Sequence, residues 1–245
     1  MKALHIKAVK TTFRTLALLA AATCLPSFAS DAYRPATFGA AQAQLENRLS
    51  LPASLLESKS TIAVYCQADV PVTGVITETQ CFEMTESGLG DQTLEALRGV
   101  AFSPAEVNGT AVPVRIQFRV VLSASGTQPS VLLLPNLGTL QGQHGVDYFA
   151  PQERLDSTAW YESYRESQVG SGKAFFERGR LTRVIASIST SGEVASVSTL
   201  DARGASGKRD AAAMEKALKS SRFIPGFVRD HATEMHYVAV LNYAK

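Results

Sequence analysis

The sequence has little of what would place a protein quickly in a functional class. Its 245 residues include three cysteines, one tryptophan and 8% aromatic residues, and no long block carries charge of one sign. No apolar run reaches the roughly 20 residues that a membrane-spanning helix needs. These absences argue against a disulfide-rich scaffold, a multi-span membrane protein and a polybasic nucleic-acid binder.

The N-terminus is basic and is followed by a short apolar run. Four basic residues precede the run from Thr15 to about Cys24, and small residues surround Ala29 and Ser30. This pattern predicts a secretory signal peptide over residues 1–30, cut near Ala29 or Ser30. An uncleaved anchor and a lipoprotein modified at Cys24 are the alternatives.

Cleavage would also change the charge of the chain. The predicted signal peptide holds four positive charges and no negative charge, so its removal changes the formal net charge from +2 to −2. A chain so near neutrality gives no electrostatic reason to expect nucleic acid or an anionic membrane surface as a partner. The remaining residues, about 215, can hold one large domain or two small ones.

Two cysteines remain in the exported chain, Cys66 and Cys81. They flank a predicted turn at Thr73-Gly74, and counting outward from a two-residue loop places Cys66 opposite Cys81. We therefore predict a disulfide, with a free-thiol pair or a metal site as alternatives. A regular turn would make the two residues a hydrogen-bonded pair, whereas Pro71 favours a bulge or a longer loop.

The first part of the chain reads as short helices followed by a strand-rich module. Residues 31–60 favour one or two short helices, because good helix formers surround Pro52. The pattern of residues 61–84 predicts a hairpin, and Asp91 is placed to cap a helix that ends at Gly99.

A long alternating strand follows, from Val112 to Leu122. Its apolar residues fall on one face, which we expect to pack on the helix. Arg115, Gln117 and Arg119 fall on the other face, which we expect to contact solvent.

The same order of elements returns near the C-terminus. Residues 181–200 form a hairpin around a turn at 189–193, Asp210 is placed to cap a helix, and a last strand carries His236 on its solvent face. Val184 and Thr199 stand where the cysteines stand in the first hairpin. We therefore predict an α+β fold built from two strand-strand-helix-strand modules with antiparallel sheets.

The predicted boundaries follow from these patterns. A helical lead-in covers residues 31–60, the first module covers 61–123, and the second covers 180–245. Residues 124–179 are predicted to be a partly ordered linker with a short helix that holds Trp160, Tyr161 and Tyr164.

A segment with Phe-x-Pro-Ala, an Asn-Gly turn and a valine-rich last strand, FSPAEVNGTAVPVRIQFRVVL, resembles the C-terminal domain of TonB-type energy transducers. The resemblance covers Thr61 to Leu122 and, more loosely, Arg180 to Tyr243, where Asp230-His231 replaces Asn-Gly. The residues that carry it are Gly74, Phe102, Pro104, Ala105, Asn108, Gly109, Gly192, Phe223 and Pro225. Some periplasmic members of the family also have paired cysteines in the hairpin.

This resemblance implies a non-catalytic periplasmic domain that binds partners by strand addition at a sheet edge. The partner would be a periplasmic or outer-membrane protein, and a homodimer is a further possibility. The chain departs from a transducer because it lacks a proline-rich spacer and a membrane anchor in the mature part. Arg115 and Arg119 are candidates to orient an acidic peptide; the alternative is that they keep an edge soluble.

A search for catalytic, metal-binding and cofactor-binding patterns gives none that is specific. The segment HATEMH places Glu234 and His236 on one strand face near His231, without the helical spacing of zinc proteases. No serine lies in a GxSxG segment. We therefore predict a non-catalytic binding or adaptor protein without cofactor or metal. The alternatives are a structural cell-envelope factor that binds peptidoglycan or self-assembles through sheet edges, and an enzyme.

Overall fold

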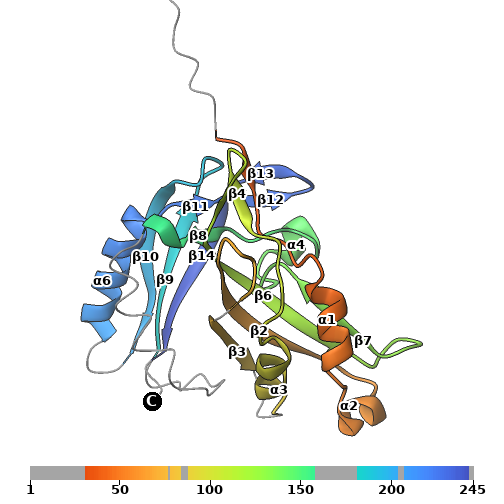
Figure 1. Cartoon of the computed structure of the whole chain (residues 1–245). Coiled ribbons are helices and arrows are strands. Elements are labelled where there is room, and N and C mark those ends of the chain that lie inside the picture. The colour runs from red at the N-terminus through yellow and green to blue at the C-terminus, as the bar shows by residue number, and fades with distance from the viewer. Residues whose placement is uncertain (1–30, 77, 84–87, 158–180, 204–206, 243–245) are drawn as a thin grey trace, which may run out of the picture. The chain divides into compact units, whose positions relative to one another are not determined.

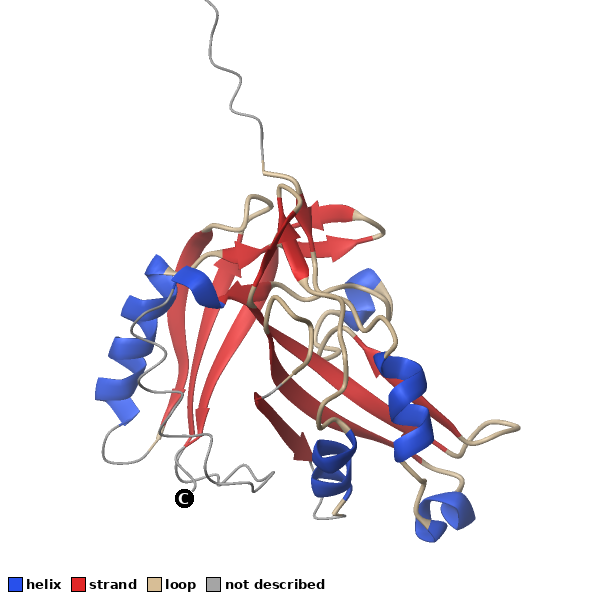
Figure 2. Ribbon diagram, viewed as in Figure 1, coloured by secondary structure: helices blue, strands red, loops and turns tan. Residues whose placement is uncertain are grey.

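The computed structural model describes the protein over residues 31–76, 78–83, 88–157, 181–203 and 207–242 (Figure 1). These residues form an α+β fold in which the paired strands run antiparallel, as the sequence predicted (Figure 2). We call residues 31–157 the N-terminal half and residues 181–242 the C-terminal half. The predicted signal peptide and the predicted helix around Trp160, Tyr161 and Tyr164 lie outside the described residues.

The N-terminal half begins with an extended segment and two short helices. β1 (Tyr33–Arg34) precedes α1 (Ala41–Arg48) and α2 (Ala53–Ser58). Pro52 stands directly before α2, where its fixed φ is compatible with a helix start. The helices expected in residues 31–60 are therefore present.

The largest sheet of the described residues has six strands. β2 (Thr61–Val70) lies between β3 (Glu78–Glu83) and β6 (Val114–Ser123), and the sheet order is β11-β8-β6-β2-β3, with β7 also paired to β6. On β6, Val114, Ile116, Phe118, Val120 and Leu122 are buried. The predicted apolar face of this strand is therefore confirmed.

The predicted continuous strand from Val112 is interrupted. Val112 belongs to β5 (Thr110–Val112), which pairs with β4 (Ala105–Val107) in a separate small sheet, and Pro113 separates β5 from β6. Proline has no backbone N–H to donate to a ladder, so the chain changes sheet at this residue.

The helix between β3 and β4 is α3 (Leu89–Ala96), which begins earlier than predicted. Asp91 lies in its first turn and Gly88 is the capping position, and the Glu83 carboxylate accepts from the Gly88 and Gly90 amides at 3.0 and 3.3 Å. The predicted cap at Asp91 is therefore wrong, although an acidic residue in the first turn still favours the helix dipole.

The segment predicted as a linker contributes strands to the first sheet. β7 (Ser130–Leu134) pairs with β6 from Arg119 to Ser123, and β8 (Gln152–Arg154) pairs with β6 at Val114 and Arg115. Between them lies α4 (Gln141–His144), and the 3-10 turn η1 (Leu155–Ser157) follows β8. The described part of the predicted linker, residues 124–157, thus belongs to the N-terminal half.

The C-terminal half has its own three-stranded sheet. β9 (Leu181–Ile188) lies between β10 (Val194–Ala202) and β14 (Met235–Asn242), and α6 (Gly207–Ser220) packs on β9 and β10. The predicted hairpin and last strand are present. Asp210 is a buried residue in the first turn of α6, three residues inside the helix, so the predicted cap is wrong here too.

Short strands connect α6 to β14. β11 (Phe223–Ile224) pairs with β8, and β12 (Gly226–Val228) forms a hairpin with β13 (His231–Thr233). Positive φ angles occur at Arg229 and Asp230, as they do at Asn108 and Gly109 between β4 and β5. The residues in the place of Asn108-Gly109 are therefore Arg229-Asp230, one position before those that the sequence suggested.

Each half has its own apolar core. In the N-terminal half, α1, α2 and α3 pack their buried leucines and alanines on the apolar face of β2 and β6. In the C-terminal half, Met214 and Leu218 of α6 pack on Val184, Ala186 and Tyr237 of the sheet. The first core also includes Ile224 of β11, and Phe227 of β12 packs against it, so apolar side chains contribute to the contact between the halves.

Candidate functional site

The outer edge of β14 is the first feature of interest, because β14 ends the strand order β10-β9-β14. Within the described residues, no strand pairs with this outer edge. The Val238 carbonyl accepts a hydrogen bond of 2.7 Å from Gln117 Nε2 of β6, so the Val238 peptide group faces away from β9. Peptide groups alternate along a strand, so His236 and Val240 also face outward.

The corresponding edge of β6 is occupied by the chain itself. β7 pairs with one end of this edge and β8 with the other. The outer edge of β7 is covered in turn by the side chain of Gln42 in α1, whose amide bonds to the Val131 carbonyl (2.6 Å) and the Leu133 N–H (2.8 Å). An amide side chain bonded in this way satisfies a strand edge as a neighbouring strand would.

The other outer strands carry features that discourage pairing. β10 has register irregularities between Val194 and Ser196 and between Thr199 and Asp201, and β3 carries Glu78 and Glu83 at its ends. Bulges and charges are ordinary protections of an edge strand. By contrast, β14 pairs with β9 in unbroken register over eight residues.

Arg115 and Gln117 are buried, which contradicts their predicted position on a solvent face. Their exposed fractions are 4% and 7%. The predicted alternation of β6 is present, but β14 lies against its second face near these residues and β8 pairs with its edge, neither of which the sequence indicates. Arg115 forms a two-point ion pair with Asp69, at 2.8 and 3.2 Å, so its guanidinium is committed inside the protein.

Arg119 lies farther along the same strand and is partly covered. Its Nη2 donates to Gln141 Oε1 of α4 at 2.6 Å, and the Gly138 backbone lies against the guanidinium. Nothing in the structure tests whether Arg119 contacts a partner, so this role stays a prediction.

Glu153 lies at the junction of the two halves and is fully buried. In the sheet, Glu153 of β8 lies opposite Arg115 of β6 on one side and opposite Phe223 of β11 on the other. The Tyr237 hydroxyl of β14 donates to its Oε2 at 3.4 Å, and Ser221 Oγ lies 3.1 Å from its Oε1. Burial raises the pKa of this carboxyl; the nearby Arg115 guanidinium lowers it in part, and Asp69 raises it further.

The residues of the Phe-x-Pro segment form corners rather than an exposed surface. The Phe102 amide donates to the Gly74 carbonyl and the Phe223 amide donates to the Gly192 carbonyl, each at 2.9 Å. Both glycines have positive φ, and a Cβ on either would collide with the carbonyl oxygen of the facing phenylalanine. Phe102 and Phe223 are buried, so each holds a turn against a core.

The remaining family-motif residues are part of the same corners. Pro104 and Pro225 each follow the phenylalanine by two residues, Ala105 is buried at the start of β4, and Asn108 and Gly109 make the turn to β5. Asn108 also accepts from the Ala32 N–H and donates to Asp31, which ties the turn to the N-terminal segment.

Cys66 and Cys81 form the predicted disulfide across β2 and β3, where they are direct partners. Their Cα atoms lie 4.1 Å apart, nearer to the spacing of a non-hydrogen-bonded pair than to that of a hydrogen-bonded one. Of the two expectations, the longer loop at Pro71 is the one observed, because the chain leaves the ladder at Pro71 and turns by a hydrogen bond from the Gly74 amide to the Pro71 carbonyl.

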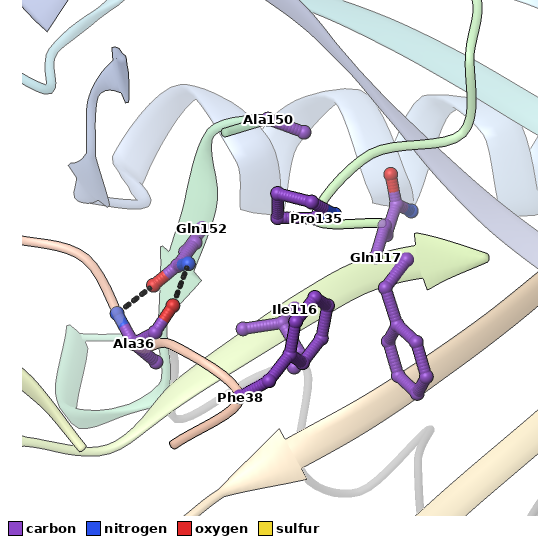
Figure 3. Close-up of a pocket in the computed structure, with 8 residues that line it drawn as sticks. Ala36, Phe38, Ile116, Gln117, Pro135, Ala150 and Gln152 are labelled. Atoms are coloured by element: carbon purple, nitrogen blue, oxygen red, sulfur yellow. Dashed lines mark hydrogen bonds between the residues drawn. The ribbon is translucent and has the colours of Figure 1, made fainter. Parts of the chain in front are cut away.

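A small hollow lies where β7 and β8 part from each other along β6. Its volume is about 10 Å³, and its lining includes Phe38, Gln117 and Pro135 (Figure 3). Gln152 points to the backbone of Ala36 beside it and makes two hydrogen bonds there, of 2.8 and 2.9 Å. A space of this size holds about one water molecule, so it is too small for an organic ligand.

His231, Glu234 and His236 are exposed on the C-terminal half, as a solvated strand face requires. Glu234 accepts a hydrogen bond from Ser187 Oγ at 2.9 Å. Among the described residues, no group of three or more His, Cys, Asp or Glu side chains is placed to hold a metal ion.

Three comparisons with known proteins found no similar protein. No protein-family model matches the chain, and searches of curated proteins and of solved structures found no match. In the part of the chain that the structure describes, no helix is long and apolar enough to cross a membrane. The functional conclusion therefore has to come from the sequence pattern and the geometry of this chain.

Proposed function

We propose that the protein is a non-catalytic binding or adaptor module of the TonB C-terminal type, which acts in the periplasm. Two strand-strand-helix-strand arrangements with Phe-x-Pro corners support the family assignment, and the disulfide supports an oxidising compartment. The partner is an extended segment of a periplasmic or outer-membrane protein, which adds as a strand to the outer edge of β14.

The observation that carries this proposal is the difference between two corresponding edges. On β6 the chain itself supplies the added strands, β7 and β8. On β14 the outward peptide groups of His236 and Val240 have no strand partner among the described residues, and the strand is neither bulged nor interrupted by proline. The Val238 carbonyl between them accepts from the Gln117 side chain of β6, so an added strand would gain main-chain hydrogen bonds at His236 and Val240 and would take the place of Gln117 at Val238.

A crosslinking experiment in the intact periplasm tests the proposal. A photo-reactive residue at His236 should capture a periplasmic or outer-membrane protein, and a synthetic peptide of the captured segment should bind the purified protein. The matched control places the same group at Lys216, which is exposed on α6. Products from position 216 identical to those from 236 would mean that the contact is not specific to the edge.

A pair of substitutions separates strand addition from side-chain contact. Val240→Pro removes an outward N–H, whereas Val240→Ala keeps it. We expect the first variant to lose capture from position 236 and the second to keep it. Capture of murein or of a second copy alone would instead favour the structural-factor alternative.

A further inference from the structure

The contact between the two halves includes a buried cluster of charged side chains. Glu153 comes from β8, Arg115 from β6 and Asp69 from β2, and their exposed fractions are 0%, 4% and 6%. Arg115 makes its two-point bond to Asp69. If Glu153 were ionised, a second carboxylate would be held near Asp69 at a position without access to water, which is costly.

The hydrogen bonds around Ser221 point to the same conclusion independently. Ser221 Oγ lies 3.1 Å from Glu153 Oε1 and 3.2 Å from the Ala217 carbonyl oxygen. A hydroxyl has one proton and can donate to only one of these acceptors at a time. If Glu153 carries a proton on Oε1, it donates to Ser221, and Ser221 donates to Ala217, so that both contacts are satisfied.

The other neighbours are compatible with a neutral acid. The Tyr237 hydroxyl donates to Glu153 Oε2, which stays an acceptor when Oε1 is protonated. The Ala217 carbonyl also accepts from Ser220 Oγ at 2.8 Å, and a carbonyl oxygen has two lone pairs for these two donors. Phe223, the partner of Glu153 on β11, is apolar and adds no charge.

We propose that Glu153 is a proton-binding site at the junction of the halves, protonated in the folded protein, and that its ionisation as the pH rises weakens the contact between β8 and the C-terminal half. The carboxylic acid bridges β8 to Ser221 and Tyr237. Loss of its proton leaves Ser221 with two acceptors for one hydrogen and brings a second buried carboxylate beside Asp69. This inference does not depend on strand addition at β14.

The sign of the pH effect follows from linkage. The pKa of Glu153 is raised in the folded state, so the folded protein binds a proton more tightly than the unfolded chain does. The stability that this proton contributes is present at low pH. It is lost as the pH rises from the ordinary glutamate pKa of about 4.3 through the folded value.

Nuclear magnetic resonance of the wild-type protein tests the site directly. The side-chain carboxyl carbon of Glu153 should titrate at a higher pH than those of the exposed glutamates. Hydrogen exchange should show that the amides of β8 and β11 lose protection over the same pH range. A carboxyl carbon that titrates at or below the ordinary range would overturn the proposal, and this measurement needs no variant.

A matched pair of variants measures the effect on stability. Glu153→Gln keeps a donor and an acceptor in place but cannot ionise, so its unfolding free energy should lose the pH slope that the wild type shows above about pH 4.3. Asp156→Asn removes an exposed carboxylate three residues away, on the same segment, and should keep the wild-type slope. Equal pH profiles for Glu153→Gln and the wild type would contradict the proposal.

Discussion

The two halves use the same strand order but surround their last strands differently. Arg115 of β6 and His236 of β14 each lie thirteen residues after the phenylalanine of their corner. Arg115 is buried and faces Asp69 across the sheet, whereas His236 is exposed and faces Ser187. Alternation alone predicts that both residues lie on a solvent-exposed face. The difference shows that the burial of a last strand depends on which other segments of the chain pack against it.

The largest expected effect comes from breaking the buried side of this comparison. Arg115→Met should destabilise the protein by about 3–5 kcal/mol, because it removes one partner of a buried ion pair, that with Asp69. His236→Ala should change stability by no more than about 0.5 kcal/mol. Urea unfolding of both variants measures the difference, and similar small changes would show that the cluster is not a stabilising contact.

The next effect concerns the disulfide, which the C-terminal half lacks. Replacing Cys66 and Cys81 together by alanine should cost about 2–5 kcal/mol, because the unfolded chain regains its freedom. Unfolding in oxidising buffer measures the loss. Addition of a reductant should then change the wild type and leave the double variant unaffected.

The same comparison can be sharpened by adding the missing bridge. Val184 and Thr199 are direct partners across β9 and β10, as the cysteines are across β2 and β3. Introducing cysteine at both positions should give a second disulfide, detected as the absence of free thiols by mass spectrometry. Two free thiols would show that the hairpins differ in geometry despite their shared register.

The glycines of the two corners should respond alike. Gly74→Ala and Gly192→Ala should each cost about 2–3 kcal/mol, because positive φ is strained and the new methyl group meets a carbonyl oxygen. Gly109→Ala is the control, since its φ is also positive but a Cβ there meets no described atom within 4 Å. If thermal unfolding shows that Gly109→Ala loses as much stability as the other two variants, the collision with the carbonyl oxygen is not the cause of the loss.

The smallest expected effect lies in a hydrogen bond that joins the N-terminal segment to the C-terminal half. The Tyr33 hydroxyl donates to the Ser191 carbonyl at 2.8 Å, in the turn between β9 and β10. Tyr33→Phe should cost about 0.5–1.5 kcal/mol. Hydrogen exchange should quicken in the turn at residues 189–193, and an equal change in the turn near Gly74 would contradict a local effect.

Local patterns were sufficient to predict much of the fold. Alternation identified both hairpins and the buried face of β6, and the register count placed Cys66 opposite Cys81. These features depend on a period of two and on turn residues, which a single sequence displays directly. Helix starts at Leu89 and Gly207 were missed because an aspartate suits the first turn as well as the cap.

The junction between the halves could not be predicted in this way. Residues 130–134 and 152–154 are too short and too near glycine and proline to show a strand period, so β7 and β8 were interpreted as linker. The contact of β14 with β6 and β8 is equally long-range, so from the sequence the second face of β6 looks solvated and Glu153 looks like an ordinary acid. One available signal is the pair of opposite charges, Asp69 at the end of one predicted strand and Arg115 near the start of another, since charges on central strands require partners.

The pairing of β8 with β6 on one side and β11 on the other has a consequence for the order of assembly. A chain that emerges N-terminus first completes β6 before the residues that cover its edge have appeared. These residues follow within about thirty positions, so they reach the edge at a high effective concentration. The N-terminal half thus closes its own edge before competing chains can use it, and the same closure anchors the strand on which the C-terminal half is then built.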